Sequence, residues 1–491
     1  MKTLEVVQHL NFRKLRNCAV LACLSMLSMS AVQASPVLTR LQGLLDATPE
    51  GGWVKASTNL FSDAWATGST AVQYPSYQNP GAVVMAWSSA AWDSARGDLL
   101  LWGGGHANYA GNEVYVWDGA SGQWGRGSLS SRVDSNYFVV DNAAPQSAHT
   151  YDNNIYLAVN DMFLTFGGAT FQSGGNFTTS IDGGVQRAGP WLWDPSKADP
   201  NKVGGTTGSG YDPNSIGGEM WTNRQGQWTG AEPSSYGNGT AAYRTENGKD
   251  VVYVTADTQG SGFQSLYRYT LGDVKNGGTD TWEKIGVMEN SVAFKGAGAI
   301  DSKRNLYIRT ADNTGSYTSE LAVWDLSKAN PANPTANKDI AIQLIREDGS
   351  RFPMTGNFGI EYDALNDQFL IWDGGDKGTV WTFKLSVDSN GNLVTTVIVK
   401  QLPSTTMAQP DGNFISGVLG KWDFIDELGA FIAINEYSAT TFDAEVWLYK
   451  PYADQTTPGG NGGETPIPEP STLLLVCLAV ALVSRTGRQI L

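Results

Sequence analysis

The chain has 491 residues, of which 41% are hydrophobic and 16% charged, with 57 Gly and 17 Trp. This composition excludes coiled coils, helical solenoids and disordered chains, all of which carry more charge and fewer aromatic residues. The formal net charge is −15, or −19 (27 basic against 46 acidic residues) without the two terminal segments described below. Such a surface argues against nucleic acid as a partner, because phosphate backbones are bound by clustered Lys and Arg.

Residues 1–34 have the three parts of a secretory signal peptide. Arg13, Lys14 and Arg16 are basic, residues 18–32 form an apolar stretch, and Val32-Gln33-Ala34 forms a small-residue exit. A buried N-terminal helix is the alternative for this apolar stretch, and the basic flank favours the signal peptide. We therefore expect an exported protein whose mature chain begins near Ser35.

From residue 53 onward a strand–turn–strand pattern recurs along the chain. Residues 91–104 (AWDSARGDLLLWGG) recur at residues 361–375 (EYDALNDQFLIWDGG), and further copies begin at Tyr151, Tyr243, Ile300 and Trp422. Each copy places Asp, Asn or Gly between two apolar runs, which predicts a β-hairpin. A third strand with aromatic residues at alternate positions follows, and a Trp marks a fourth at Trp124, Trp228 and Trp282.

Four strands per repeat predict a β-propeller, whose circular arrangement protects the sheet edges. We expect an all-β protein with a single propeller over residues 35–452, built from about six four-stranded blades. The longer step between Asp152 and Tyr243 holds a Gly-rich insertion, and a seventh blade within residues 165–235 is the alternative. Trp53-Val54-Lys55 precedes the first repeat and is expected to form the outer strand of the last blade, so that the N-terminal strand closes the ring.

The repeat resembles the kelch repeat, the propeller type that includes the central domain of galactose oxidase. The resemblance rests on Gly103-Gly104 after the second strand, Tyr115 in the third and Trp124 in the fourth. Later repeats depart from it, with Thr310-Ala311-Asp312 and Ile434-Asn435-Glu436 where the glycine pair is expected. A kelch resemblance implies the fold and leaves the activity open.

The C-terminal end is organised differently. Residues 453–467 are rich in Gly and Pro and are expected to form a flexible linker. Residues 468–491 contain Pro468-Glu469-Pro470, then an apolar run at residues 473–483, and two arginines close to the end, Arg485 and Arg488. This order of parts resembles the PEP-CTERM sorting signal of Gram-negative bacteria that make exopolysaccharide.

The sorting-signal resemblance implies a partner and a location. The partner is an exosortase-like membrane transpeptidase that acts on the tail, and the location is the cell envelope, outer surface or extracellular matrix of a Gram-negative bacterium. Eleven apolar residues at 473–483 are fewer than the ~20 that span a bilayer. We therefore expect a transient or anchored membrane contact through residues 472–484.

The mature domain contains no cysteine. Cys18 and Cys23 lie in the predicted signal peptide and Cys477 in the tail. Disulfides, thiolate metal ligands and a cysteine nucleophile are therefore excluded from the domain. The copper site of galactose oxidase, which needs a Cys-modified tyrosine, is excluded for the same reason.

The mature chain has two histidines, and the repeat register places both on one face of the ring. His106 follows the second strand of the first blade, and His149 begins the second blade. Strand directions alternate within a blade, so the loops that carry these residues share a side. The site predicted around them comprises His106, Asn108, Tyr109, Asn112, Glu113, His149 and Tyr151, with His106 and His149 as the candidate catalytic residues.

Three interpretations of this pair stay open. The histidines can serve only to hydrogen-bond neighbouring loops, or they can join Tyr109 and Tyr151 in a carbohydrate-binding site. In the third, the protein is a polysaccharide lyase in which one imidazole removes the proton next to a uronate carboxylate. A lyase of this kind also needs a cation to neutralise the carboxylate, for which the sequence offers Arg187, Arg224 and Arg244.

We expect no cofactor and no metal. Two histidines cannot form a zinc site without added carboxylates, and the chain contains neither a P-loop nor a G-x-S-x-G motif. Acidic turns such as residues 363–367 suit Ca²⁺ less well than they suit their ordinary role in hairpin turns. The sequence thus predicts an exported, surface-sorted propeller that binds carbohydrate or another extracellular partner, with a polysaccharide lyase as the alternative.

Overall fold

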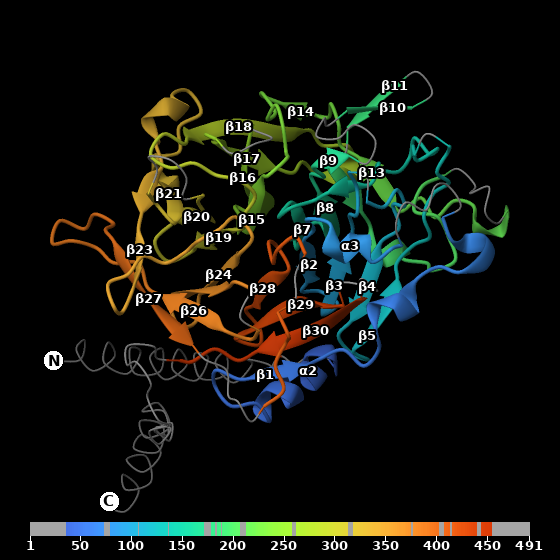
Figure 1. Ribbon diagram of the computed structural model, residues 1–491. Helices are drawn as coiled ribbons and strands as arrows, with labels where there is room; N and C mark the ends of the chain where they lie inside the picture. Colours follow the sequence, from blue (N-terminus) through green and yellow to red (C-terminus); the bar gives the residue numbers. More distant parts are fainter. Residues whose placement is uncertain are drawn as a thin grey trace, which may run out of the picture. The chain divides into compact units, whose positions relative to one another are not determined.

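The computed structural model describes residues 36–453, apart from residues 73–78, 107, 136, 171–177, 182–183, 188, 207–212, 258–261, 313–317, 375–376, 402–406, 413–414 and 439–442. The signal peptide, most of the linker and the sorting signal lie outside the described residues. The described residues up to Ala453 belong to one compact unit. Within it, antiparallel sheets of four or five strands form six blades of a β-propeller (Figure 1), as the repeats predicted.

The blades follow one another along the chain. Blade 1 consists of β2 (Ala90–Asp93), β3 (Asp98–Leu101), β4 (Tyr115–Asp118) and β5 (Gln123–Arg126). Blade 2 consists of β7 (Asn154–Leu157), β8 (Met162–Thr165), β12 (Trp191–Trp193) and β13 (Trp221–Asn223). Blade 3 consists of β15 (Thr240–Glu246), β16 (Lys249–Ala256), β17 (Ser265–Thr270), β18 (Asp280–Val287) and β14 (Trp228–Thr229). Blade 4 consists of β19 (Gly298–Asp301), β20 (Leu306–Thr310), β21 (Leu321–Asp325) and β22 (Ile340–Ile342). Blade 5 consists of β24 (Gly359–Asp363), β25 (Gln368–Trp372), β26 (Val380–Phe383), β27 (Thr396–Gln401) and β23 (Leu344–Arg346). Blade 6 consists of β28 (Trp422–Ile425), β29 (Ala430–Ser438), β30 (Asp443–Tyr449) and β1 (Trp53–Lys55).

The remaining elements are short and lie outside the blades. Two small sheets pair β6 (Ala148–His149) with β9 (Ala169–Thr170) and β10 (Thr178–Ile181) with β11 (Gly184–Arg187). The helices are α2 (Pro36–Asp46), α3 (Ala82–Met85) and the 3-10 turns η1 (Phe61–Ala64), η2 (Gly68–Thr70), η3 (Pro195–Lys197), η4 (Pro213–Ser215), η5 (Val274–Asn276), η6 (Leu326–Lys328) and η7 (Pro334–Ala336). None of these helices is long and apolar enough to cross a membrane, within the part of the chain that the structure describes.

The structure decides between six and seven blades and corrects one strand assignment. The described part of residues 165–235 does not form a seventh blade, because its strands β12 and β13 complete blade 2. The fourth strand of that blade is marked by Trp221, so the assignment of Trp228 to a fourth strand was wrong. Trp228 lies in β14, which runs parallel to β18 as a fifth strand of blade 3.

The ring closes as the position of Trp53 predicted. β1 pairs antiparallel with β30, so the last blade combines a strand from the start of the domain with three from its end. The Trp53 side chain is 1% exposed, and its indole N–H donates to the Gly378 carbonyl at 2.7 Å. Its ring packs against Trp372 of blade 5 at 5.2 Å and Trp422 of blade 6 at 5.6 Å between centroids. One side chain thus joins the chain's beginning to two blades at its end.

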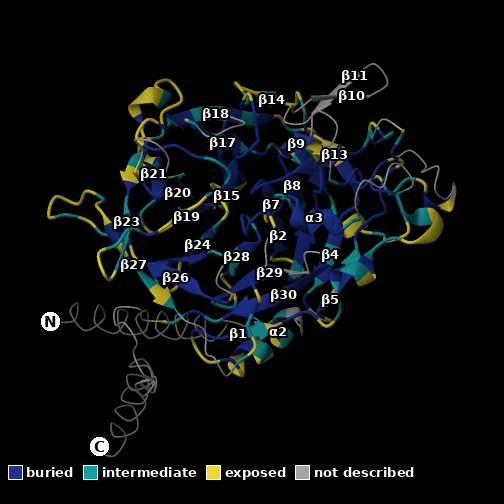
Figure 2. Ribbon diagram, viewed as in Figure 1, coloured by how far each residue is buried: buried dark blue, intermediate teal, exposed yellow. Residues whose placement is uncertain are grey.

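The six first strands β2, β7, β15, β19, β24 and β28 form a ring around the centre, each next to the first strand of the following blade (Figure 1). Apolar residues fill the spaces between neighbouring blades, and most blade residues are buried (Figure 2). Between blades 1 and 2, for example, Trp102 packs with Trp191, Trp193 and Trp221. The core is therefore divided into layers between blades, which explains the alternating aromatic residues of the third strands.

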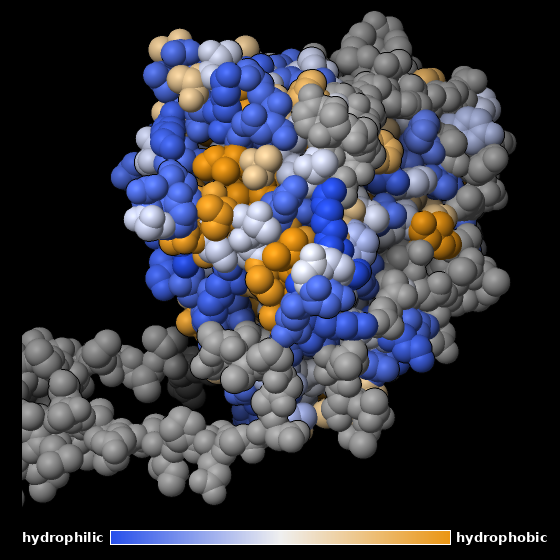
Figure 3. Space-filling view, turned by 60° about the vertical axis from the view of Figure 1, so that its left-hand side comes forward, coloured by the Kyte–Doolittle hydropathy of each residue, from blue (hydrophilic) through white to orange (hydrophobic). Residues whose placement is uncertain are grey.

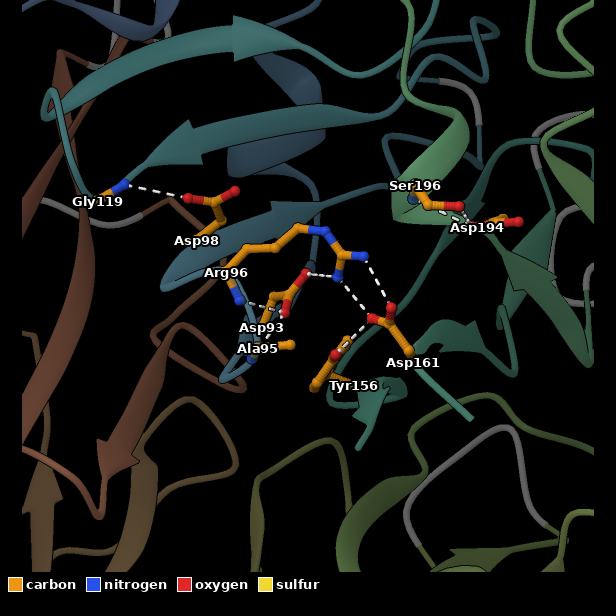
Figure 4. Close-up of polar contacts among 9 residues, drawn as sticks. All are labelled: Asp93, Ala95, Arg96, Asp98, Gly119, Tyr156, Asp161, Asp194 and Ser196. Carbon is orange, nitrogen blue, oxygen red and sulfur yellow. Dashed lines mark hydrogen bonds and ion pairs between the residues drawn. The ribbon is translucent and has the colours of Figure 1, made fainter. Parts of the chain in front are cut away.

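Polar latches join the hairpin turns of adjacent blades. The Arg96 guanidinium in blade 1 contacts Asp93 of its own turn at 2.9 Å and Asp161 of blade 2 at 2.5 and 2.8 Å (Figure 4). Tyr156 also donates to Asp161, at 2.7 Å. Blades 4 and 5 repeat this arrangement with Asp301, Arg304, Tyr362 and Asp367. The Asp and Arg residues of the repeat therefore have a structural role on this face.

Exposed apolar side chains on the outside of the ring are scattered. On blade 5 they include Val387 and Val397, which are 55% and 46% exposed. Figure 3, turned toward this side of the ring, shows apolar groups interrupted by hydrophilic surface. Small apolar areas of this kind are normal on a folded protein, and they identify no docking surface.

Truncating the side chain that closes the ring should destabilise the whole domain. We expect Trp53→Ala to lower the free energy of unfolding by about 3–5 kcal/mol, because it leaves a cavity between two blades. Chemical denaturation followed by tryptophan fluorescence measures this. Leu365→Ala, at a side chain that is 66% exposed, serves as the control and should change stability by less than about 0.5 kcal/mol. Equal stability of the Trp53 variant and the parent protein would contradict this account of closure.

Candidate functional site

The blade topology gives the ring two different faces. Hairpin turns between first and second strands lie on one face with the latches. The loops between second and third strands, and the segments that lead into the first strands, lie on the other, which we call the mouth face. Five side chains meet there and form what we call the mouth cluster: Trp87, His106, His149, Tyr151 and Lys295.

The two histidines lie against each other on the mouth face. Their ring centroids are 5.2 Å apart, and the rings are nearly perpendicular at 87°. His106 is exposed, whereas His149 is 1% exposed. His149 is the second residue of β6, which pairs with β9, and it therefore precedes the first strand of blade 2, β7, rather than beginning it. The sequence-based expectation that these loops share a side thus corresponds to a direct contact between blades 1 and 2.

His149 is held in its neutral form. Burial, followed by the nearby charges of His106 and Lys295, lowers its pKa to about 3. With its amide nitrogen facing the imidazole, Asn108 donates to His149 Nε2 at 2.8 Å and to the His106 carbonyl at 3.1 Å. This contact holds the imidazole ring in place against the loop after β3. His149 is therefore a fixed neutral group under physiological conditions.

Trp87 and Lys295 belong to the cluster although the sequence analysis did not select them. The Trp87 ring lies 4.8 Å from the His149 ring, and Lys295 Nζ lies 4.9 Å from the Trp87 centroid. Both side chains are partly exposed. Burial lowers the pKa of Lys295, and Asp312 acts in the opposite direction. The cluster therefore joins residues of blades 1, 2 and 4.

The repeat itself brings these side chains together. Trp87, Tyr151 and Lys295 each stand three residues before a first strand, and all three have left-handed backbone angles, with φ of 46°, 52° and 59°. Leu419, at the same place before β28, has φ of 52°. Because equivalent positions of a propeller surround its axis, aligning this position across the repeats would have found Trp87 and Lys295. A left-handed non-glycine residue costs about 1–3 kcal/mol, and such residues cluster at functional sites.

The segment that carries Trp87 is anchored by blade 6. It follows α3, whose four residues are buried. Ser416 accepts from the Trp87 backbone N–H at 2.9 Å, and Lys421 Nζ donates to the Val84 carbonyl at 3.1 Å. The Tyr151 N–H donates to the Trp87 carbonyl at 2.6 Å, which links blade 2 to the same segment. The mouth cluster is thus held from both neighbouring blades.

The other residues predicted for this site form a layer beneath it. Tyr109, Asn112 and Glu113 are 2–4% exposed. Glu113 Oε1 accepts from Tyr109 at 2.6 Å and from Tyr115 at 2.9 Å, and burial raises its pKa. Asn112 donates to the Pro145 carbonyl at 3.0 Å. These contacts tie the loop after β3 together, so ligand contact by these three residues stays a prediction.

The arginines considered for a lyase lie elsewhere or outside the described side chains. Arg224 is 2% exposed and pairs with Asp280 at 2.6 Å on the outer side of blade 3. Arg244 contacts Glu246 and Asn305 near the hairpin turns, on the face opposite the mouth. The side chain of Arg187 lies outside the described residues. Lys295, rather than Arg224 or Arg244, is the cation next to the histidines.

A second polar site that the sequence did not reveal lies in the central channel. A cavity of about 470 Å³ is lined by the first strands of all six blades and contains Asp152, Glu361 and Asp423. Burial raises the pKa of Asp423 to about 6. Burial, followed by the charge of Asp423, raises the pKa of Glu361 well above its usual value. Asp152, whose pKa burial also raises, accepts from the Gly298 N–H at 2.8 Å.

These carboxylates do not amount to a metal site. No group of three or more His, Cys, Asp or Glu side chains is arranged to hold a metal ion in the described ranges. The raised pKa values instead indicate that burial in the channel disfavours the charged form of these carboxylates. The channel carboxylates are therefore an electrostatic cost to the fold.

Known proteins resemble this chain only weakly, in sequence and in structure. No family model and no curated protein matches the chain. Among solved structures, an α-L-arabinanase of Penicillium chrysogenum complexed with arabinobiose is 12% identical, with a TM-score of 0.40 over 76% of this chain and 95% of that chain. An α-L-arabinofuranosidase of Fusarium graminearum in complex with an iminosugar inhibitor is 10% identical, with a TM-score of 0.39 over 74% and 92%. Similarity this weak assigns neither family nor activity, and the six blades rest on the chain's own strand pairing.

The buried neutral histidine should make stability depend on pH. Its folded pKa near 3 lies below the unfolded value of about 6.5, so the unfolded chain binds more protons between these values. Stability should therefore fall as pH decreases from about 6.5 toward about 3. Glutamine has a hydrogen-bond acceptor but does not titrate. We therefore expect His149→Gln to flatten the dependence of stability on pH in this range. Urea denaturation across this range measures it, and identical curves for variant and parent would contradict the buried neutral state.

The channel carboxylates should affect the pH dependence of stability in the opposite direction from His149. A raised folded pKa means that the stability present in acid is lost as pH rises above the unfolded value of about 4.3. Glu361→Gln keeps the shape and removes the charge, so this variant should be more stable than the parent near pH 8 and gain less near pH 4. The same denaturation series measures this. A Glu361→Gln variant that is less stable near pH 8 would show that the charged form is stabilised instead.

Proposed function

We propose that this protein is an exported propeller that binds carbohydrate at the mouth cluster. The observation that carries the proposal is the convergence on one face of Trp87, His106 and Lys295, all with solvent-accessible surface. Carbohydrate sites combine an aromatic surface for the sugar ring with a few fixed polar groups that set its orientation. Asn108, which is partly exposed, supplies such a group next to His106, and the buried neutral His149 holds Asn108 in place.

The arrangement favours binding over β-elimination at the same place. A general base works best when its pKa is near the working pH. The pKa of His149 is about 3, and burial raises that of Tyr151 to about 12. Neither value suits a proton transfer near neutral pH. The lyase is therefore kept as the second candidate, with His106 as its remaining base.

Export and surface sorting complete the proposal and rest on the sequence of the two ends. Residues 1–34 support secretion, and residues 468–491 support sorting by an exosortase-like enzyme. A location in the envelope or matrix would bring the mouth face into contact with exopolysaccharide. Carbohydrate is then the partner that is most abundant around the protein.

Binding should depend on the exposed ring side chains of the mouth cluster. With residues 35–455 on a glycan array and then by titration calorimetry, we expect Trp87→Ala and His106→Ala each to weaken binding by about tenfold, or ~1.4 kcal/mol. Leu365→Ala on the opposite face should bind like the parent. Measuring absorbance at ~235 nm in the same samples detects the unsaturated product of elimination.

Two outcomes would decide against this function. Absence of binding to every glycan would remove the proposal. Unchanged binding in both mouth variants, with a lower melting temperature, would show that the cluster only holds the loops together. Formation of unsaturated product by the parent protein would favour the lyase.

A further inference from the structure

We infer that the carbohydrate is anionic and that Lys295 binds its charged group. This inference rests on the proposed function and names the class of ligand. The charged group is a carboxylate or a sulfate, both of which present acceptor oxygens to an ammonium. Three features of the structure support it: the position of Lys295, the charges around it and the contacts that hold its backbone.

Lys295 differs from other lysines of the protein in its surroundings. No ion pair involves it within the part of the chain that the structure describes, where Lys303 and Lys338 contact carboxylates at 2.6 Å. Its ammonium instead lies over the rings of Trp87 and Phe294, 4.9 and 5.0 Å from their centroids. Partly buried charges are normally paired, because they lose hydration. An anionic ligand group would supply the missing partner.

Apart from Asp312, the side chains around Lys295 that the structure describes carry no negative charge. His149 is neutral, His106 lies against it, and Trp87 and Phe294 are aromatic. Asp312 is the acidic group that acts on Lys295. Without its terminal segments the chain has a net charge of −19, so it repels acidic polymers at long range. Binding of an acidic glycan therefore needs a local positive site, and the mouth cluster has one.

Arg309 holds Lys295 in place from below. The Arg309 side chain is fully buried, and its guanidinium donates to the Lys295 carbonyl. It also donates to Thr255 at 2.7 Å and to the Thr310 carbonyl at 3.0 Å. These bonds fix the left-handed backbone of Lys295, at φ of 59°. Arg309 therefore acts as a positioning residue, and its own charge adds to the positive potential at the mouth.

The test compares acidic and neutral forms of one polysaccharide. Polygalacturonate and its carboxyl-reduced, neutral form are titrated into the mature chain, with a sulfated galactan as the arm that separates sulfate from carboxylate. We expect the parent to prefer an acidic form and to lose affinity for it between about 50 and about 300 mM NaCl. Lys295→Met, which keeps the aliphatic contact with Trp87, should lower affinity for the acidic glycan about tenfold or more and leave the neutral form unchanged.

Two further variants act as controls. Lys295→Arg should restore the preference for the acidic form because it restores the charge. Lys328→Met, which removes a charge from a side chain that is 64% exposed in blade 4, should leave the preference unchanged. If Lys295→Met does not fold, Lys295→Gln and the salt dependence of the parent provide the same comparison.

The outcomes separate the inference from the function on which it rests. If Trp87→Ala weakens binding but Lys295→Met leaves the ratio of acidic to neutral affinity unchanged, the inference is overturned and the binding function stands. A parent protein that prefers the neutral form also overturns it. If neither glycan class binds, the proposed function fails and the inference fails with it.

Discussion

Closure of the ring is the constraint on which the rest of the structure depends. Each blade buries both of its faces against its neighbours, so an incomplete blade would expose an edge and two apolar layers. β1 completes the last blade by pairing with β30, and Trp53 fills the space between blades 5 and 6. The two ends of the domain are thereby part of one sheet. Every other feature, including the mouth cluster, relies on six blades held at fixed positions.

Closure gives the two faces different chemistry. On the hairpin face, Asp and Arg side chains of the turns pair between blades, as Arg96 does with Asp161. On the mouth face, the longer loops and the segments that lead into the first strands carry aromatic and cationic side chains that converge near the axis. The acidic channel lies between, with Asp152, Glu361 and Asp423 in a cavity. A strongly acidic protein thus has its one described cluster of His and Lys where a ligand can reach it.

The mouth cluster also shows how one position of a repeat can carry different side chains in different blades. A left-handed residue three positions before the first strand is a feature of several blades, and in blade 6 it is the buried Leu419. In blades 1, 2 and 4 the same position carries Trp87, Tyr151 and Lys295. The backbone conformation is therefore part of the fold, while the choice of side chain distinguishes the mouth. The strain at these positions is supported by buried contacts such as that of Arg309 with Lys295.

The sequence by itself determined the all-β class, the hairpin repeat, the closing strand at Trp53 and the shared face of His106 and His149. These follow from local patterns, because alternation of apolar residues and turn residues acts over a few positions and strand direction alternates within a blade. It placed the fourth strand of blade 2 wrongly at Trp228 instead of Trp221, because strand pairing decides between two nearby tryptophans. Nor did it identify Lys295 beside Trp87, the carboxylates of the channel or the neutral state of His149. Those depend on contacts around the ring axis between residues up to several hundred positions apart and on burial, and both exist only once the ring has closed.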